Sequence, residues 1–307
     1  MVVIVKLMGG LGNQLFQYAT GKALAERQGA PLKVDLSWYE RDDRRGAFQL
    51  DRFLLPCEVA TLEEIKRLKR GTSSIVSLLR HYGQDQIAGR LFSVTHSATS
   101  PQDLTYYPER TIDFDPAVMD LSDNVYLDGF WQCENYFCSL RQELLNGFQL
   151  REEPDKENRD ILTSIVSSES VCLHIRRGDY LSDTSATRVH GICSPAYYER
   201  AISYLKEVLH DPTFFIFSND PAWVRERFDL GNRFVSVENN QGAGFMDIYL
   251  MKHCNHFVIA NSTFSWWGAW LSEAEDKLVI GPKQWFLSKN YRDADRMPAS
   301  WLRMDNL

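Results

Sequence analysis

Residues 213–228 read Thr-Phe-Phe-Ile-Phe-Ser-Asn-Asp-Pro-Ala-Trp-Val-Arg-Glu-Arg-Phe. The apolar and aromatic run 213–219 is typical of a buried strand. Asp220 followed by Pro221 is typical of a helix start, because a polar cap and a proline at the first helical position both suit a free helix N-terminus. A strand that leads directly into a helix is half of a βαβ unit, so this stretch favours an α/β fold with parallel strands.

The same alternation of strand and helix repeats along most of the chain. In the second half we predict strands at 171–177, 213–219, 233–238, 256–261 and 278–281, and helices at 195–210, 221–228, 244–254 and 263–273. In the first half we predict strands at 2–7, 32–36 and 125–131, and helices at 13–27, 61–70 and 134–146. The charged segment 151–156 contains Pro154 and has no apolar period. It predicts a boundary between domains of residues 1–150 and 151–307, with a C-terminal tail free to pack back on the first domain.

Composition argues against several classes of protein. The chain has 307 residues, 44% hydrophobic and 24% charged, as in ordinary globular proteins. Its net charge of −7 argues against a nucleic-acid partner, which usually requires a positive face. The one basic cluster, residues 66–70, is interpreted as a solvated helix face, with weak attachment to an anionic membrane surface as the alternative. No apolar run reaches the roughly 18 residues of a transmembrane helix.

Secretion is not indicated either. The N-terminus lacks the basic lead and the small-residue cleavage site of a signal peptide. The six cysteines form no C-x-x-C pair and no metal-ligand rhythm, so we expect reduced thiols, several of them buried. These features predict a cytoplasmic protein.

Ligands of parallel α/β sheets bind beyond the carboxyl ends of the strands, which narrows the search for a site. The strongest signal there is His-Ile-Arg-Arg-Gly-Asp-Tyr at residues 174–180. On the predicted strand, Arg176 shares a face with His174 and Arg177 points to the other. Two arginines on a buried strand are costly unless they meet anions, and a diphosphate would neutralise them without a metal. The alternative is a structural salt-bridge hub in which Asp179 and other carboxylates pair with both arginines.

Glycines after the first predicted strand form a second candidate site. Residues 8–15 read Met-Gly-Gly-Leu-Gly-Asn-Gln-Leu. Gly10 and Gly12 let backbone N–H groups approach an anion where a helix begins. The full G-x-G-x-x-G pattern is missing because leucine fills its last position. A structural tight turn explains the glycines equally well, but the amides of Asn13 and Gln14 at the helix mouth favour ligand binding.

Polar residues also follow two later strands. Ser218 is near the end of the predicted strand 213–219 and Asp220 follows it, where a carboxylate can accept hydrogen bonds from a nucleobase or a ribose. Capping of the next helix is an equally good explanation of Asp220. Further along, small polar side chains open a helix and would converge as a second anion cradle, with ordinary N-capping as the alternative. They are Asn261, Ser262, Thr263 and Ser265, and Trp266 and Trp267 after them are expected in the core.

No metal site is predicted. Asp113-x-Asp115 and Asp293-x-Asp295 have the spacing that holds Mn²⁺ or Mg²⁺ in many sugar-nucleotide enzymes, but neither pair follows a strand of the sheet. Both pairs are interpreted as solvated turn aspartates. A predicted helix end separates His253 from His256, so the two side chains are not expected to face the same metal ion.

Taken in order, three of these stretches resemble the α-1,2-fucosyltransferases of glycosyltransferase family 11. They are Gly-Gly-Leu-Gly-Asn-Gln-Leu-Phe-Gln at 9–17, the arginine motif at 174–180, and Asn-Ser-Thr-Phe-Ser-Trp-Trp-Gly at 261–268. The similarity runs from Leu7 to about Pro282. The arginine motif also occurs in α-1,6-fucosyltransferases, whereas the two flanking motifs specify the α-1,2 group. One departure is Asn219, because the family often reads Ser-Asp-Asp here.

The resemblance implies a GT-B-like α/β fold, in which two Rossmann-type domains with parallel sheets face each other across a cleft. It implies an acceptor-side first domain and a second domain that binds the GDP-sugar. The implied reaction is inverting, metal-independent transfer of L-fucose from GDP-β-L-fucose to the 2-hydroxyl of a terminal β-galactoside of a glycan, with no cofactor beyond the donor.

The resemblance also implies residues for each substrate. Arg176 and Arg177 would hold the pyrophosphate, and His174 and Asp220 would read guanine. The full donor set is Gly10, Gly12, Asn13, Gln14, His174, Arg176, Arg177, Ser218, Asp220, Asn261, Ser262, Thr263 and Ser265. The acceptor candidates, which follow the last strand of the first domain, are Trp131, Gln132 and Glu134.

A base must also remove the proton of the acceptor hydroxyl. Asp179 is the carboxylate of the arginine motif and our choice. Its two neighbouring arginines favour the ionised form and make it a weak base, so it can instead orient them. Glu134, Asp128 and Asp183 are the other candidates.

Three competing functions stay open at this point. The first is an α-1,6-fucosyltransferase or another GDP-sugar transferase of the same fold. The second is a nicotinamide-dependent oxidoreductase, for which Asp35 is acceptably placed but the glycine pattern is broken by Leu15. The third is a carbohydrate-binding module without activity, for which two anion cradles and an arginine pair are excessive.

Overall fold

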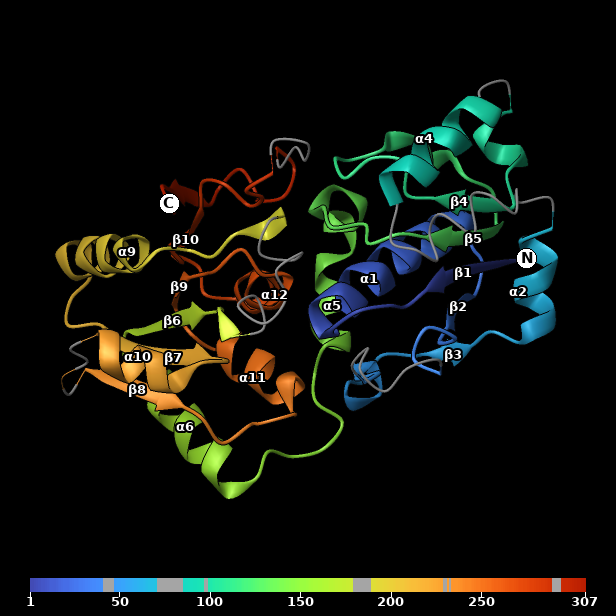
Figure 1. Ribbon diagram of the computed structural model, residues 1–307. Coiled ribbons are helices and arrows are strands. Elements are labelled where there is room, and N and C mark those ends of the chain that lie inside the picture. Colours follow the sequence, from blue (N-terminus) through green and yellow to red (C-terminus); the bar gives the residue numbers. More distant parts are fainter. Residues whose placement is uncertain are drawn as a thin grey trace. The chain divides into compact units, whose positions relative to one another are not determined.

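The computed structural model describes residues 1–40, 47–70, 85–96, 99–178, 189–228, 231, 233–288 and 294–307. The chain forms two compact units. Unit 1 comprises Met1–Gln149 with Ala294–Arg296, and unit 2 comprises Leu150–Asp293 with Met297–Leu307. Each unit has its own parallel sheet with helices packed around it (Figure 1).

Unit 1 contains a five-stranded sheet in the order β3-β2-β1-β5-β4. The strands are β1 (Val2–Lys6), β2 (Leu32–Asp35), β3 (Glu58–Val59), β4 (Tyr106–Pro108) and β5 (Asn124–Asp128). The helices are α1 (Leu11–Gln28), α2 (Leu62–Leu68), α4 (Asp85–Thr95) and α5 (Arg141–Gly147), with 3₁₀ turns η2 (Leu50–Arg52), η3 (Pro101–Asp103), η4 (Pro116–Asp120), η5 (Glu134–Tyr136) and η6 (Cys138–Leu140). Val3, Ile4 and Val5 of the central strand are fully buried, as expected where helices cover both faces of a parallel sheet.

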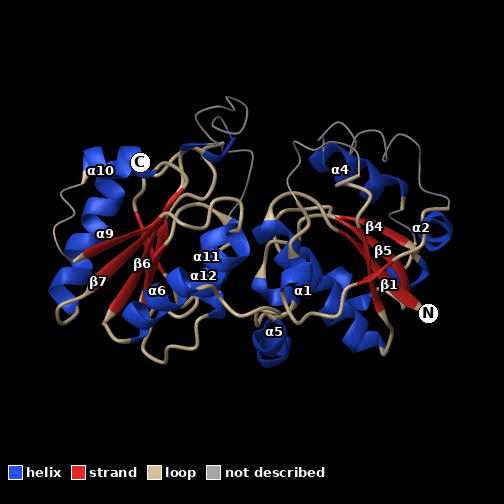
Figure 2. Ribbon diagram, turned by 90° about the horizontal axis from the view of Figure 1, so that it is seen from below, coloured by secondary structure: helices blue, strands red, loops and turns tan. Residues whose placement is uncertain are grey.

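Unit 2 contains a six-stranded sheet in the order β11-β10-β9-β6-β7-β8, also parallel throughout. The strands are β6 (Ser170–Ile175), β7 (Thr213–Ser218), β8 (Phe234–Val237), β9 (His256–Val258), β10 (Val279–Pro282) and β11 (Leu302–Met304). The helices are α6 (Lys156–Val166), α9 (Pro195–Val208), α10 (Pro221–Arg227), α11 (Gly244–Met251) and α12 (Thr263–Leu271). Figure 2 shows α9 and α10 on one face of this sheet and α6, α11 and α12 on the other.

Strand order reverses once in each sheet, and the reversals define where ligands can bind. In unit 2 the chain runs outward from β6 through β7 to β8, then returns to β9 on the other side of β6. In unit 1 it runs from β1 through β2 to β3, then crosses to β4 at the other edge and ends with β5 between β4 and β1. Connections that diverge from neighbouring strands leave a crevice at their carboxyl ends.

The sequence predicted the repeating elements and missed those with little apolar pattern. Among the missed elements are α4, α6, β4 and the edge strand β11, two of whose three residues are exposed. The predicted helix 134–146 is broken into η5, η6 and α5. The predicted strand 171–177 ends at Ile175, so Arg176 and Arg177 follow the strand and do not occupy opposite faces of it.

Several expectations about side chains can also be compared with the structure. Trp266 and Trp267 are fully buried, as predicted. All six cysteines are free, and four of them are buried. The basic cluster 66–70 is not wholly a solvated face, because the ammonium group of Lys69 lies 4.4 Å from the ring centre of Tyr126. Among the described residues, no helix combines the length and apolar character needed to cross a membrane.

Candidate functional site

The carboxyl ends of β9, β6 and β7 bring three of the predicted motifs together in unit 2. β6 lies between the other two strands, and its last residue, Ile175, pairs with Ser218 at the end of β7. The arginine pair follows β6, Asn219 and Asp220 follow β7, and the Asn261–Ser265 segment follows β9. This is the strand-order reversal of unit 2, where a parallel sheet offers a ligand crevice.

Arg176 lies beside the N-terminus of α12. Its Nη1 donates to Ser262 Oγ over 2.9 Å. The same oxygen accepts from the backbone N–H of Phe264 at 3.3 Å, so Ser262 is the N-cap of α12. A guanidinium therefore lies next to the positive end of a helix dipole. Two positive groups in contact favour an anion at this point.

Arg177 extends toward β7 and has three contacts there. Its Nε forms an ion pair with Asp220 Oδ2 at 3.1 Å. Its Cζ lies 4.1 Å from the ring centre of Trp223, a favourable cation–π distance. Its backbone N–H donates to Asn219 Oδ1 over 3.0 Å. The two arginines thus diverge along the sheet edge, each held by the segment after a neighbouring strand.

Asp220 caps the helix that follows β7, and its contact with guanine stays a prediction. Its Oδ1 accepts from the backbone N–H of Trp223 at 3.2 Å, and its Oδ2 pairs with Arg177. Both oxygens thus contact groups of the chain, so the helix-cap interpretation of Asp220 is confirmed. Ser218 Oγ accepts from the backbone N–H of Asp220, which makes Ser218 part of the same turn. The pairing also agrees in part with the salt-bridge alternative for Arg177.

The Asn261–Ser265 segment is less of a hydroxyl cluster than the sequence indicated. Asn261 is buried, and its Nδ2 donates to the carbonyls of His190, Gly191 and Trp285. Ser265 is fully buried, with Oγ 3.4 Å from the Ser262 carbonyl. Asn261 and Ser265 therefore shape the loop, whereas Ser262 and the half-buried Thr263 lie where α12 begins.

His174 lies near the end of β6 and is buried, with its ring centre 5.7 Å from that of Phe264 on α12. Guanine contact by His174 stays a prediction. Asp179 and Asp183, two of the candidate bases, lie outside the described residues. The carboxylate of Asp128, another candidate base, is buried and accepts from Lys6 Nζ at 3.3 Å and from the Tyr106 hydroxyl at 2.9 Å.

The glycine loop of unit 1 follows β1 and leads into α1. Gly9 has φ = +77°, and a Cβ there would lie 2.6 Å from the side chain of Asn13, so only glycine fits. Gly10 is the N-cap residue of α1, and Gly12 lies buried in the first turn. Gln14 is fully buried, and its amide bonds to the backbones of Gly9, Ala47 and Gln49. The structure thus gives Gln14 a structural function, contrary to the ligand contact expected from the sequence.

Asn13 lies in a polar chain that joins α1 to the segment after β5. Gln132 Nε2 donates to Asn13 Oδ1 at 2.8 Å. The buried Arg296, which belongs to unit 1 although it lies near the C-terminus, donates from Nη1 to the Gln132 carbonyl at 2.8 Å and to Gln132 Oε1 at 2.5 Å. These side chains surround the β1/β5 reversal, where unit 1 can bind a ligand.

Trp131, predicted on the acceptor side, is a core residue in unit 1. Its indole is fully buried against Tyr107 and Tyr136. Its φ of +56° is unfavourable for a non-glycine residue, and the Glu109 carboxylate fixes this turn by accepting from the N–H groups of Phe130 and Trp131 at 2.9 Å each. This turn fixes the position of Gln132, the next residue. Glu134, two residues further along, is half-buried.

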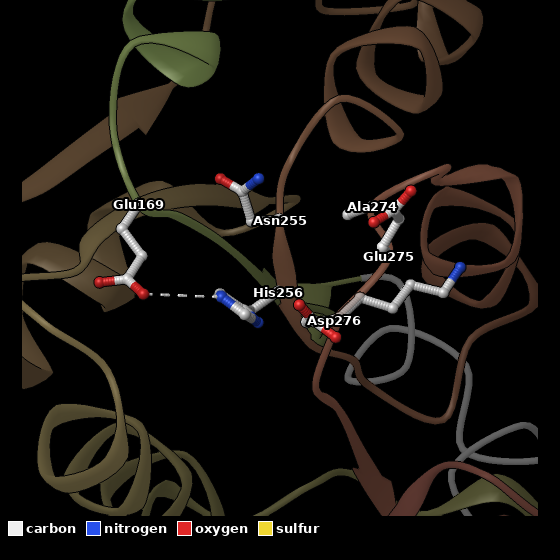
Figure 3. Close-up of a pocket in the computed structure, with 7 residues that line it drawn as sticks. Glu169, Asn255, His256, Ala274, Glu275 and Asp276 are labelled. Atoms are coloured by element: carbon white, nitrogen blue, oxygen red, sulfur yellow. Dashed lines mark ion pairs between the residues drawn. The ribbon is translucent and has the colours of Figure 1, made fainter.

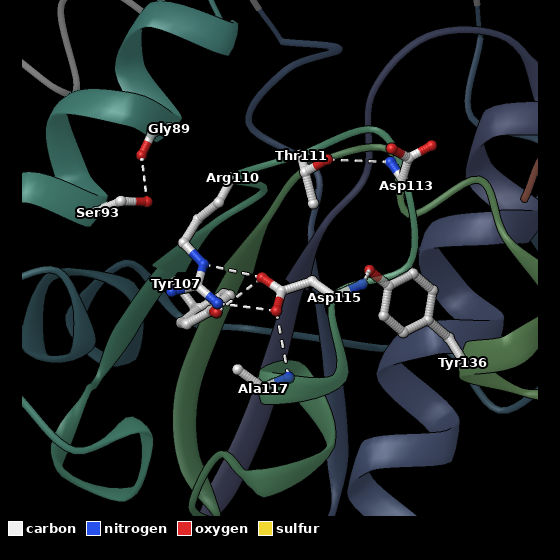
Figure 4. A network of polar contacts seen from close by, with 9 residues as sticks. All are labelled: Gly89, Ser93, Tyr107, Arg110, Thr111, Asp113, Asp115, Ala117 and Tyr136. Carbon is white, nitrogen blue, oxygen red and sulfur yellow. Dashed lines mark hydrogen bonds and ion pairs between the residues drawn. The ribbon is translucent and has the colours of Figure 1, made fainter. Parts of the chain in front are cut away.

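The aspartates with metal-like spacing are not simply solvated. Asp115 is buried and accepts two hydrogen bonds from Arg110, both 2.8 Å, and one from the Tyr107 hydroxyl at 2.9 Å (Figure 4). Asp295 Oδ2 accepts from the backbone N–H of Phe114, and Asp293 lies outside the described residues. Within the described part of the chain, no three His, Cys, Asp or Glu side chains group as metal ligands would.

A pocket of about 490 Å³ lies at the opposite edge of the unit 2 sheet, where β6 and β9 begin. Its lining includes Glu169, Asn255 and His256, and His256 Nε2 lies 4.0 Å from Glu169 Oε1 (Figure 3). Burial lowers the pKa of His256, while Glu169 and Asp276 act in the opposite direction. Because it lies at the amino ends of the strands, this pocket is distinct from the arginine site.

Comparison with known proteins identifies the family. The sequence model described as "Glycosyl transferase family 11" matches residues 103–304. The chain belongs to glycosyltransferase family 11. It is 31% identical over 311 residues to an α-1,2-colitosyltransferase of Escherichia coli, covering 99% of both chains. It is 26% identical over 276 residues to galactoside α-(1,2)-fucosyltransferase 2 of Oryctolagus cuniculus, covering 87% of this chain and 66% of the relative.

Family 11 membership agrees with the fold. The crystal structure of fucosyltransferase NodZ from Bradyrhizobium matches 88% of this chain and 92% of its own, with a TM-score of 0.54 and 15% identity. That match concerns the fold, and the GT-B-like α/β architecture expected from the sequence is confirmed. The family assignment also removes the oxidoreductase and the non-catalytic module from consideration.

Proposed function

We propose that this family 11 glycosyltransferase transfers L-fucose from GDP-β-L-fucose to the 2-hydroxyl of a terminal β-galactoside, with inversion and without a metal ion. The observation that carries the proposal is Arg176 beside the N-terminus of α12. Each of these positive groups attracts an anion, and together they favour one more strongly than either alone. A nucleoside diphosphate has the charge and the oxygens that such a site binds.

The chemistry of transfer uses the same charges. Cleavage of the fucosyl–phosphate bond leaves negative charge on GDP and gives the sugar oxocarbenium character. Preorganised donors aimed at such a developing charge contribute about 3 kcal/mol each. Ser262 holds Arg176, and Asp220 with Trp223 holds Arg177 before any donor arrives. The two guanidinium groups would therefore supply the charge that a divalent metal supplies in other nucleotide-sugar enzymes.

The acceptor side belongs to unit 1 in this proposal. Gln132, bound to Asn13 and Arg296, is a fixed amide at the β1/β5 reversal and can bind sugar hydroxyls. Trp131 supports the turn from the core rather than contacting the sugar. Asp179 and Glu134 remain the proposed bases for the acceptor hydroxyl.

GDP-colitose is a specific alternative to GDP-fucose as the donor. The relative that matches 99% of this chain is named an α-1,2-colitosyltransferase, whereas the fucosyltransferases of mammals match at lower identity. Colitose is L-fucose without its 3-hydroxyl. An enzyme that hydrogen-bonds this hydroxyl rejects the deoxy sugar strongly, whereas an apolar pocket favours it.

One assay tests the whole proposal. Purified protein is incubated with GDP-fucose or GDP-colitose and a β-galactoside, with and without EDTA, and the product is analysed by NMR. We expect an α-1,2-linked fucoside formed equally well in EDTA. An α-1,6 linkage, retention of configuration, dependence on a divalent ion, or a preference for GDP-colitose would each overturn the corresponding part of the proposal.

A further inference from the structure

Asn219 directly follows β7, and the structure gives it a defined set of contacts. Its Oδ1 accepts from the backbone N–H of Arg177 at 3.0 Å and from that of Gly178 at 3.1 Å. One side-chain oxygen thus binds two successive amides of the segment that follows β6. The bonds connect the carboxyl ends of β6 and β7 just beyond the last paired residues, Ile175 and Ser218.

The two segments also pack closely. A Cβ on Gly178 would lie 3.0 Å from the Asn219 carbonyl oxygen and 3.6 Å from the side chain, so glycine allows this approach. The next residue, Asp220, pairs with the guanidinium of Arg177. Asn219 therefore fixes the backbone of Arg177 while Asp220 fixes its side chain.

We propose that Asn219 is a positioning residue for the donor diphosphate, acting through Arg177. The inference rests on the proposed function, because it presupposes that the arginine pair binds the diphosphate. Both bonds use the side-chain oxygen as acceptor, so a carboxylate at this position can make them as well as an amide.

Asn255 offers a matched control in the same unit. Its Oδ1 accepts from the N–H and the hydroxyl of Ser170 at 3.0 and 2.9 Å, at the amino end of β6. Asn219 and Asn255 thus use the same atom type to bind the two ends of one strand. Only Asn219 is at the edge that carries the arginines.

The test compares GDP affinity by calorimetry and the KM values for donor and acceptor. Asn219→Leu, which keeps the size and removes the oxygen, should raise the Kd for GDP and the donor KM about tenfold and leave the acceptor KM unchanged. Asn219→Asp should stay within about threefold of the parent protein. Asn255→Leu should lower thermal stability with GDP affinity unchanged. Asn219→Ala removes the same oxygen without bulk and replaces the leucine variant if that one does not fold.

A double-mutant cycle with Arg177→Ala shows through which residue Asn219 acts. If it acts through Arg177, Asn219→Leu should have little further effect on GDP affinity in the Arg177→Ala background. Full additivity, or normal GDP binding by Asn219→Leu, would overturn the inference. A parent protein that binds no GDP would instead overturn the proposed function, so the two failures are distinguishable.

Discussion

Arg176 and Arg177 are the residues on which the proposed donor site depends, and their single substitutions are the most direct test. Arg176→Ala and Arg177→Ala should each weaken GDP binding by about 10- to 100-fold, because a hydrogen bond to a charged group is worth roughly 1.5–3 kcal/mol. Calorimetry with GDP measures this. Arg225→Ala is the control for the loss of a positive charge, since Arg225 forms an exposed ion pair with Glu238 and is not among the predicted donor residues. Normal GDP binding by both arginine variants would make the pair structural.

Asp247, a residue of α11, leads to a prediction about how the free energy of unfolding depends on pH. Burial raises the pKa of its carboxyl to about 7, although a hydrogen bond from Asn240 acts in the opposite direction. The folded state therefore keeps a proton that the unfolded state has lost above about pH 4. The contribution of Asp247 to the free energy of unfolding should fall between about pH 4 and pH 7, by at most about 1.4 kcal/mol per pH unit.

Asp247→Asn keeps an oxygen that can accept from Asn240 and removes the titration. Urea unfolding should show the variant gaining stability over the parent protein as the pH rises from 5 to 8. An equal difference at the two pH values would contradict the raised pKa.

The sequence predicted Arg176 and Arg177 at the carboxyl end of a strand, where the structure has them, but it did not predict their partners. Arg176 and Arg177 were found because charge beside a buried strand is rare. That Asp220 would pair with Arg177, and Gln14 with the 47–49 backbone, depends on segments distant in sequence. Such partners follow from tertiary packing, which local spacing does not specify.

Among the helices, α12 has an N-cap residue, Ser262, that stabilises the helix and also holds a residue of the proposed donor site. Ser262→Ala removes the acceptor for the Phe264 N–H and should cost about 1 kcal/mol of unfolding free energy. It also removes the hydroxyl that holds Arg176, so GDP affinity should fall as well. Thr61→Ala, which removes the capping box of α2, should lower stability and leave GDP binding unchanged. Equal GDP affinity in the two variants would contradict the assignment of Ser262.

The helices and strands that bury the most apolar surface were the easiest to predict from the sequence. The core strands β6 and β7 were recovered within two residues because their runs are continuously apolar. Helix α6 was missed because its N-terminal half is charged and it begins where the charged segment expected as the domain boundary ends. The predicted strand 171–177 continued through Arg176 and Arg177. Their charges end the apolar run, and β6 ends at Ile175.

For the whole molecule, the proposed function predicts how GDP should affect the free energy of unfolding. In that proposal, guanidinium groups take the place of a metal ion. A ligand that binds only the folded state raises the unfolding free energy by RT ln(1 + [L]/Kd), or about 2.7 kcal/mol at a hundredfold excess over Kd. Because Arg176 and Arg177 provide the positive charge, the rise in melting temperature with GDP should be the same in EDTA and in Mn²⁺. It should be smaller in Arg176→Ala and kept in Arg225→Ala, whose exposed side chain forms its ion pair with Glu238. A shift that EDTA abolishes and Mn²⁺ restores would show that a metal completes the site.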